Sequence, residues 1–243
     1  MSITIPSPFR LVTLFVLTAL SLAPGLCYGE ESFAEVKAKA DKGEPSAQYQ
    51  LGCFYYGGKG VATNAATAVS WIRKAAEQGY LEAQDALGTH CQIGLGVLMD
   101  EEEAVAWYRK AAERGYAPAQ ANLGKCYYRG TGVREDFTLA VSWFRKAIEQ
   151  GNAEGQIQLG DCYYGGRGVP ADKVEAYAYY ALAAVSDEEA QKKLAYQGGD
   201  PEFRRKGQQR AKEIQKEIQA KMAAKKATEE KAGKKATEEK AGK

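Results

Sequence analysis

The 243-residue chain contains a single histidine, five cysteines and three methionines. One histidine excludes any metal site that needs two imidazole ligands, and so few cysteines cannot form a disulfide-stapled scaffold. The longest apolar run, residues 11–23, is shorter than the ~20 residues that a membrane-spanning helix needs. Apolar residues still make up 45% of the chain. A sizeable core is therefore expected, and collagen-like, low-complexity and polytopic membrane proteins are excluded.

The apolar run near the amino terminus has the features of a secretory signal peptide. It follows Arg10 and precedes small residues, with Cys27 and Gly29 at the −3 and −1 positions of a cleavage site. We therefore predict a signal peptide at residues 1–29 and a periplasmic or secreted mature chain. A lipid or uncleaved membrane anchor is the alternative, although Leu26 is larger than the residue that usually precedes a lipidated cysteine.

Charge is unevenly distributed along the chain. Residues 30–200 contain 18 basic and 24 acidic side chains, a net charge of −6, whereas residues 201–243 contain 14 and 7, a net charge of +7. A basic tail of this kind can contact anionic lipid or envelope polymers, or it can serve only to keep the protein in solution. Both interpretations remain open.

Leu-Gly pairs recur along the sequence at a constant spacing. Each pair lies 36 residues from the last, and an aromatic residue follows each pair at a fixed distance. These repeated positions, which we expect to be structural, are Leu51, Gly52, Trp71, Leu87, Gly88, Trp107, Leu123, Gly124, Trp143, Leu159, Gly160 and Tyr179. Sequence self-similarity at this period is typical of helical-repeat proteins.

Each repeat predicts two helices joined by a tight turn. The first helix carries the Leu-Gly pair and ends at Gly-x-Gly-Val, where glycine permits positive φ. An N-cap residue then precedes the second helix, as Asp136 does in the third repeat. One helix pair cannot bury its own apolar face, so successive pairs must stack into a solenoid. The expected seam between pairs contains the tryptophans.

This arrangement predicts the following domains. The fold class is all-α, a right-handed α-α superhelix of four 36-residue helix-turn-helix units with capping helices. The predicted segments are a capping helix at 30–46, repeats at 47–82, 83–118, 119–154 and 155–189, a degenerate cap at 190–200, an amphipathic helix at 201–224 and a Lys/Ala/Glu-rich tail at 225–243. In the amphipathic helix, Ile214, Ile218 and Met222 form a stripe that can dock on the solenoid or pair with another chain.

The repeated pattern resembles the Sel-one-like repeat, a relative of the tetratricopeptide repeat. In the third unit it reads Ala119, Gln120, Leu123, Gly124, Tyr127, Gly130, Gly132, Val133, Asp136, Ala140, Trp143, Lys146, Ala147, Gln150 and Gly151. The second unit departs with Cys91 in place of tyrosine, and the fourth has Tyr179 in place of tryptophan. The resemblance covers about residues 47–185.

The resemblance implies where a partner would bind. In the tetratricopeptide geometry, first helices line a concave surface, and the register gives the inward-facing positions. Carried over, the expected partner-binding residues are Tyr49, Tyr56, Asp85, Gln92, Lys125, Tyr128, Arg129, Asp161 and Tyr164. Tyrosines are favoured at such surfaces, but these tyrosines could equally pack between repeats.

No catalytic constellation is recognisable in the sequence. Cys-x-x-Cys, His-Glu-x-x-His and Gly-x-Ser-x-Gly motifs are lacking, and His90 has no second histidine to pair with. Cys53, Cys91, Cys126 and Cys162 are expected to be buried thiols, with a disulfide as the alternative.

We therefore predict a non-catalytic exported scaffold that binds a peptide or envelope protein, without cofactor, metal or nucleic acid. The alternatives are a cell-wall hydrolase or β-lactam-binding protein, as some members of the resembling family suggest, and a structural spacer tethered by its basic tail.

Overall fold

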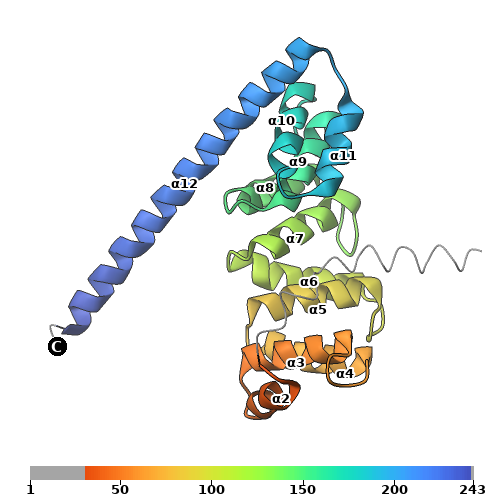
Figure 1. The fold of residues 1–243 in the computed structure, drawn as a ribbon, viewed down its shortest axis with the longest axis vertical. Helices are drawn as coiled ribbons and strands as arrows, with labels where there is room; N and C mark the ends of the chain where they lie inside the picture. Colours follow the sequence, from red (N-terminus) through yellow and green to blue (C-terminus); the bar gives the residue numbers. More distant parts are fainter. Residues whose placement is uncertain (1–30, 242–243) are drawn as a thin grey trace, which may run out of the picture. The chain divides into compact units, whose positions relative to one another are not determined.

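The computed structural model describes residues 31–241, and the expected signal peptide at 1–29 lies outside that range. The described residues form α-helices and no strands (Figure 1). The helices are α2 (Phe33–Asp41), α3 (Pro45–Gly57), α4 (Ala65–Glu77), α5 (Leu81–Ile93), α6 (Glu101–Glu113), α7 (Ala117–Arg129), α8 (Phe137–Ile148), α9 (Ala153–Gly165), α10 (Lys173–Ala183), α11 (Glu188–Gln197) and α12 (Pro201–Ala241). The predicted all-α solenoid of consecutive helix pairs is confirmed.

The chain divides into two compact units. In the N-terminal unit, which ends at Met99, α3 packs against α2 and α4, and α5 packs against α4. In the C-terminal unit, which begins at Asp100, each helix from α6 to α10 packs against the next. Helices α11 and α12 both pack against α10. Within each unit, neighbours in sequence are therefore neighbours in space, as expected of a solenoid.

The helix boundaries follow from the predicted turn and cap chemistry. Asp136 accepts a hydrogen bond from the backbone N–H of Leu139 at 2.8 Å, and Asn64, Asp100 and Asp172 cap their helices in the same way. Gly130 ends α7 with φ of 68°. In the same turn, a Cβ on Gly132 would collide with the main chain of Glu101 at the start of α6. Glycine is therefore needed there both for its backbone conformation and for its lack of a side chain.

The Leu-Gly pair is the core contact of each repeat. Leu51, Leu87, Leu123 and Leu159 are completely buried. The glycine that follows lets the second helix approach closely, because a Cβ on Gly124 would lie 2.5 Å from the Phe144 ring. Gly52 meets Ile72, and Gly160 meets Tyr180, in the same manner. The glycine of the first helix thus packs directly against a side chain of the second helix in the same repeat.

The repeated aromatic residues differ in how deeply they are buried. Trp107 is buried, but Trp71, Trp143 and the equivalent Tyr179 are only half-buried. The next residue in each helix is the buried one: Ile72, Tyr108, Phe144 and Tyr180 are at most 3% exposed. A helix turns about 100° per residue, so only one of two adjacent positions points directly at the core and the other lies nearer its border. Each tryptophan lies beneath a lysine, with Lys146 Nζ 3.9 Å from the Trp143 ring centroid.

A buried glutamine joins each of the first three repeats to the helix before it. Gln120 Nε2 donates to the carbonyl of Ala112 near the end of α6, and Gln120 Oε1 accepts from Gln150 Nε2 at 2.9 Å. Gln48 makes the same contacts with Ala40 and Gln78. Because a buried amide without partners is costly, these bonds fix where each new first helix begins.

Helix α12 docks on the C-terminal unit with only part of its length. Ala211, Ile214 and Ile218 are buried in the core formed by α8, α9 and α10, whereas Met222 is 45% exposed. Arg210 pairs with Glu175 at 2.6 Å, and Lys221 pairs with Glu149 at 2.8 Å. The helix is continuous through residue 224, where the sequence predicted a low-complexity tail to begin. Among the described residues, no helix is long and apolar enough to cross a membrane.

Candidate functional site

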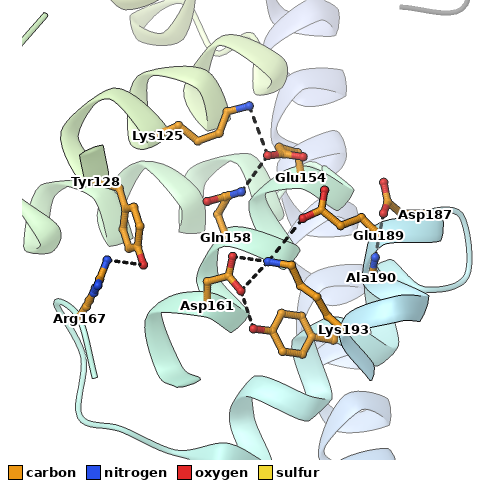
Figure 2. Close-up of polar contacts among 11 residues, drawn as sticks. Lys125, Tyr128, Glu154, Gln158, Asp161, Arg167, Asp187, Glu189, Ala190 and Lys193 are labelled. Carbon is orange, nitrogen blue, oxygen red and sulfur yellow. Dashed lines mark hydrogen bonds and ion pairs between the residues drawn. The ribbon is translucent and has the colours of Figure 1, made fainter. Parts of the chain in front are cut away.

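Polar side chains from the first helices of the C-terminal unit form a row (Figure 2). Lys125 on α7 pairs with Glu154 on α9, with 3.3 Å between Nζ and Oε1. Glu154 Oε1 also accepts from Gln158 Nε2 at 3.0 Å, one turn further along α9. Lys125 and Glu154 are both about one-third exposed or less, so this pair is in contact with solvent but held in place. We call Lys125, Glu154, Gln158, Asp161 and Lys193 the inner-helix row.

Asp161 is the most fully bonded member of the inner-helix row. Lys193 Nζ on α11 donates to both carboxylate oxygens at 2.6 and 2.7 Å, and Tyr180 Oη donates to Oδ1 at 2.6 Å. Lys193 also lies 3.5 Å from Glu189. The pKa of Tyr180 is raised, first by burial and then by its hydrogen bond to Asp161. Tyr180 therefore remains a proton donor to Asp161 at every physiological pH.

At the turn end of the same surface, an arginine lies against two aromatic rings. Arg167 Nη1 donates to Tyr128 Oη at 3.1 Å, and its guanidinium carbon is 5.2 Å from the Tyr128 ring centroid and 5.5 Å from that of Phe137. Those two rings meet edge to face at 5.5 Å. We call Tyr128, Phe137 and Arg167 the arginine corner. It joins the third and fourth repeats, because Arg167 is the middle residue of the fourth Gly-x-Gly turn.

The structure brings together the predicted partner-binding residues of the C-terminal unit. Lys125 and Asp161 belong to the inner-helix row, and Tyr128 belongs to the arginine corner. Tyr164 is 46% exposed, and both Tyr128 and Tyr164 lie close enough to Tyr180 to contribute to its raised pKa. Arg129 is exposed at the end of α7. Their use as a binding surface is a proposal, taken up below.

The predicted residues of the N-terminal unit are engaged in its own packing. The rings of Tyr49 and Tyr80 lie 5.6 Å apart, and Tyr56 meets His90 edge to face at the same distance. Asp85 and Gln92 are half-buried. His90 Nδ1 donates to the carbonyl of Leu95 at 2.9 Å, because a carbonyl can only accept. Burial lowers the pKa of His90 and keeps the ring neutral.

Sequence reasoning missed several residues that complete the site. Tyr180 could have been found, because it occupies the register of Ile72, Tyr108 and Phe144, one position after the aromatic that was singled out. Lys193 has no equivalent in the other repeats, and only the fold brings it to Asp161. Arg167, Phe137, Glu154 and Gln158 were likewise not selected.

The chemistry of the site is that of positioning, not of proton transfer. A catalytic acid or base needs a pKa near the working pH, and Tyr180 is displaced far above it. Burial raises the pKa of Cys126 to about 11 and that of Cys162 to about 12, so neither free thiol is activated as a nucleophile. Over residues 31–241, no three His, Cys, Asp or Glu side chains are grouped to hold a metal ion.

Comparisons with known proteins give one family. The Sel1 repeat model matches residues 45–80, 81–116, 117–152 and 153–184. No curated protein matches the chain. Among solved structures, a protective antigen of uropathogenic Escherichia coli described as having an SLR fold is 41% identical over 69% of this chain, with a TM-score of 0.64. A Sel1 repeat protein from Oxalobacter formigenes is 36% identical over 68% of this chain, with a TM-score of 0.58.

The similarity covers 36% of the Escherichia coli chain and 48% of the Oxalobacter chain, so it extends over the repeats and not over either whole protein. The four matched segments nevertheless coincide with the helix pairs that begin at α3, α5, α7 and α9. They account for more than half of the residues of this chain. The chain therefore belongs to the Sel1 repeat family.

Proposed function

We propose that this chain is a protein-interaction scaffold that binds an extended peptide segment of a partner across the inner-helix row and the arginine corner. Sel1 repeat proteins generally act as scaffolds for protein–protein interaction. The observation that carries the proposal is that exposed aromatic and cationic side chains lie beside the inner-helix row, whose polar side chains are held in place. Tyr164 supplies the aromatic surface, and Arg129 and Arg167 supply the charge.

Preorganisation supports binding on this surface. Lys125, Asp161 and Lys193 are already held by partners on neighbouring helices, so a peptide need not immobilise them. Ordering a long side chain on association costs about 0.5–1.5 kcal/mol, and that cost is reduced for each of these residues. Tyrosine adds apolar contact area and a hydroxyl with little entropy to lose.

The sequence is also compatible with two other functions. A wall hydrolase or β-lactam-binding protein would need an activated nucleophile, and the family is generally non-catalytic. A spacer tethered by its tail would need no fixed side-chain geometry on the inner-helix row. Export of the mature chain, its periplasmic or secreted location and contact of its tail with anionic envelope surfaces remain proposals.

Site-specific photocrosslinking tests the proposed surface directly. A photoreactive phenylalanine analogue would replace Tyr164 on the inner helices or, as the control, Lys146, which is exposed on the second helix α8. The full chain would be irradiated in an envelope extract, and crosslinked peptides would be identified by mass spectrometry. We expect a defined peptide crosslinked from position 164 and not from 146. Equal crosslinking from both positions, or from 146 alone, would place the partner elsewhere.

A further inference from the structure

Arg167 and Arg129 are cations without a carboxylate partner among the described residues. Lys125 is paired with Glu154, and Asp161 is paired with Lys193. Neither Arg167 nor Arg129 has an ion pair with any residue of the described chain, and both are exposed. Figure 2 shows Arg167 and Tyr128 at one end of the surface and Glu189 at the other. The turn end of the surface is therefore its cationic end.

The guanidinium of Arg167 is held so that most of its donors stay available. A guanidinium has five N–H donors in a planar fork, and Tyr128 Oη occupies one of them. The aliphatic part of the side chain extends over Gly165, where a Cβ would lie 3.7 Å from Arg167 Cγ. Two aromatic rings and one hydrogen bond thus limit the conformations of an exposed arginine. Such an arginine loses less entropy when it binds a second group.

We propose that the arginine corner binds a carboxylate of the peptide partner, supplied by an aspartate or glutamate side chain. The proposal rests on the proposed function and adds the chemistry of the ligand. Arginine and carboxylate form two parallel charge-assisted hydrogen bonds, a geometry that a planar fork fixed against aromatic rings matches. The exposed Arg129, next to Tyr128 in sequence, adds positive charge at the same end of the surface.

The amino-acid preference of the surface tests this proposal. Random peptide libraries displayed on phage would be selected on the intact chain, one library fused through the peptide carboxyl terminus and one with that terminus free. We expect peptides from the fused library to share Asp or Glu at one fixed position. Enrichment only in the library with free carboxyl termini would assign the corner to a terminal carboxylate and overturn the side-chain proposal.

Three variants then connect the preference to Arg167. For the selected peptides, Arg167→Gln should weaken binding by about 10-fold or more in fluorescence anisotropy, because a charge-assisted pair is lost. Arg167→Lys should retain part of the affinity, since it keeps the charge but loses the fork. The matched control is Arg145→Gln, an exposed arginine on α8, which should bind like the parent chain.

The outcomes separate this inference from the proposed function. Selected peptides that lack a fixed acidic residue, or that bind Arg167→Gln as tightly as the parent chain, would overturn the carboxylate proposal and leave peptide binding intact. Failure to select any peptide from either library would contradict both. Circular dichroism of each variant would establish that a loss of binding does not reflect a loss of helix.

Discussion

At the scale of single residues, the packing of each repeat depends on which of two adjacent residues in its second helix points toward the core. In three second helices the buried residue fits against a glycine of the first helix, as Phe144 does against Gly124. The neighbouring tryptophan lies at the border of the core under a lysine. The aromatic residue that stands out in the sequence is therefore not the residue that contributes most to the stability of the core.

Truncation of the two neighbours in α8 should show this difference. Phe144→Ala removes a completely buried ring and should lower the free energy of unfolding by about 3–5 kcal/mol. Trp143→Ala removes a half-buried ring and should cost no more than about half as much. Urea unfolding followed by circular dichroism measures both. A larger loss for Trp143→Ala would contradict the assignment of Phe144 as the main core residue.

His90 gives the N-terminal unit a predictable pH dependence. Its folded pKa is lowered by burial, so the unfolded chain binds the proton more readily. Stability is therefore fully present above the unfolded pKa of about 6.5 and is lost as the pH falls below it. The melting temperature should decrease between pH 7.5 and 5.5, and His90→Gln should flatten that decrease. An unchanged pH profile in the variant would assign the effect to other groups.

At the scale of helices, the fold was largely predictable and the site only in part. The 36-residue period, the N-caps and the glycine turns located the paired helices. The inward register of the C-terminal unit selected Lys125, Tyr128, Asp161 and Tyr164. Lys193 and Arg167 were missed because their contacts join segments that no local pattern relates. Nor could periodicity reveal that Gln120 connects one repeat to the next.

The glutamine connection can be measured at Gln120. Gln120→Ala removes the hydrogen bonds to the Ala112 carbonyl and from the Gln150 amide, and it should cost about 1–3 kcal/mol of stability. Gln209→Ala on the exposed face of α12 serves as the control and should change stability by less than about 0.5 kcal/mol. Comparable small effects in chemical denaturation would mean that the buried amides contribute little to joining the repeats.

Helix α12 should contribute to stability through its docked half alone. Ile214→Ala removes a side chain that is 3% exposed and should cost about 2–5 kcal/mol. Met222→Ala, two turns further along the same helix, removes a 45% exposed side chain and should cost less than about 0.5 kcal/mol. Differential scanning calorimetry compares the two. Equal shifts in melting temperature would show that docking extends past Lys221.

At the scale of the whole molecule, charge is separated between a net acidic body and a net basic C-terminal segment. Residues 201–243 carry 14 basic and 7 acidic side chains, although the docked part of α12 uses Arg210 and Lys221 in ion pairs with the body. Of the other basic side chains, five lie before residue 221 and seven lie beyond it. Electrostatic attraction over this segment would be weakened strongly by salt.

Vesicle sedimentation distinguishes a surface-binding tail from one that only keeps the chain in solution. With vesicles that contain phosphatidylglycerol, the full chain should sediment at low ionic strength and be released at about 0.5 M salt, where the Debye length is only a few ångströms. A chain that ends at residue 224 lacks seven of the lysines and should sediment less. Equal sedimentation of the two chains would exclude the tail as the contact.

The fits of Gly52 with Ile72, of Gly124 with Phe144 and of Gly160 with Tyr180 each lie inside one hairpin. The arginine corner, in contrast, lies across the boundary between two hairpins. Duplication or loss of a complete hairpin would therefore leave the glycine packing inside the other hairpins intact. It would, however, create or remove a binding site of the kind that lies between two hairpins. Ligand preference in such a protein can therefore diverge by changes in hairpin number and order, without any compensating adjustment of the packed interior.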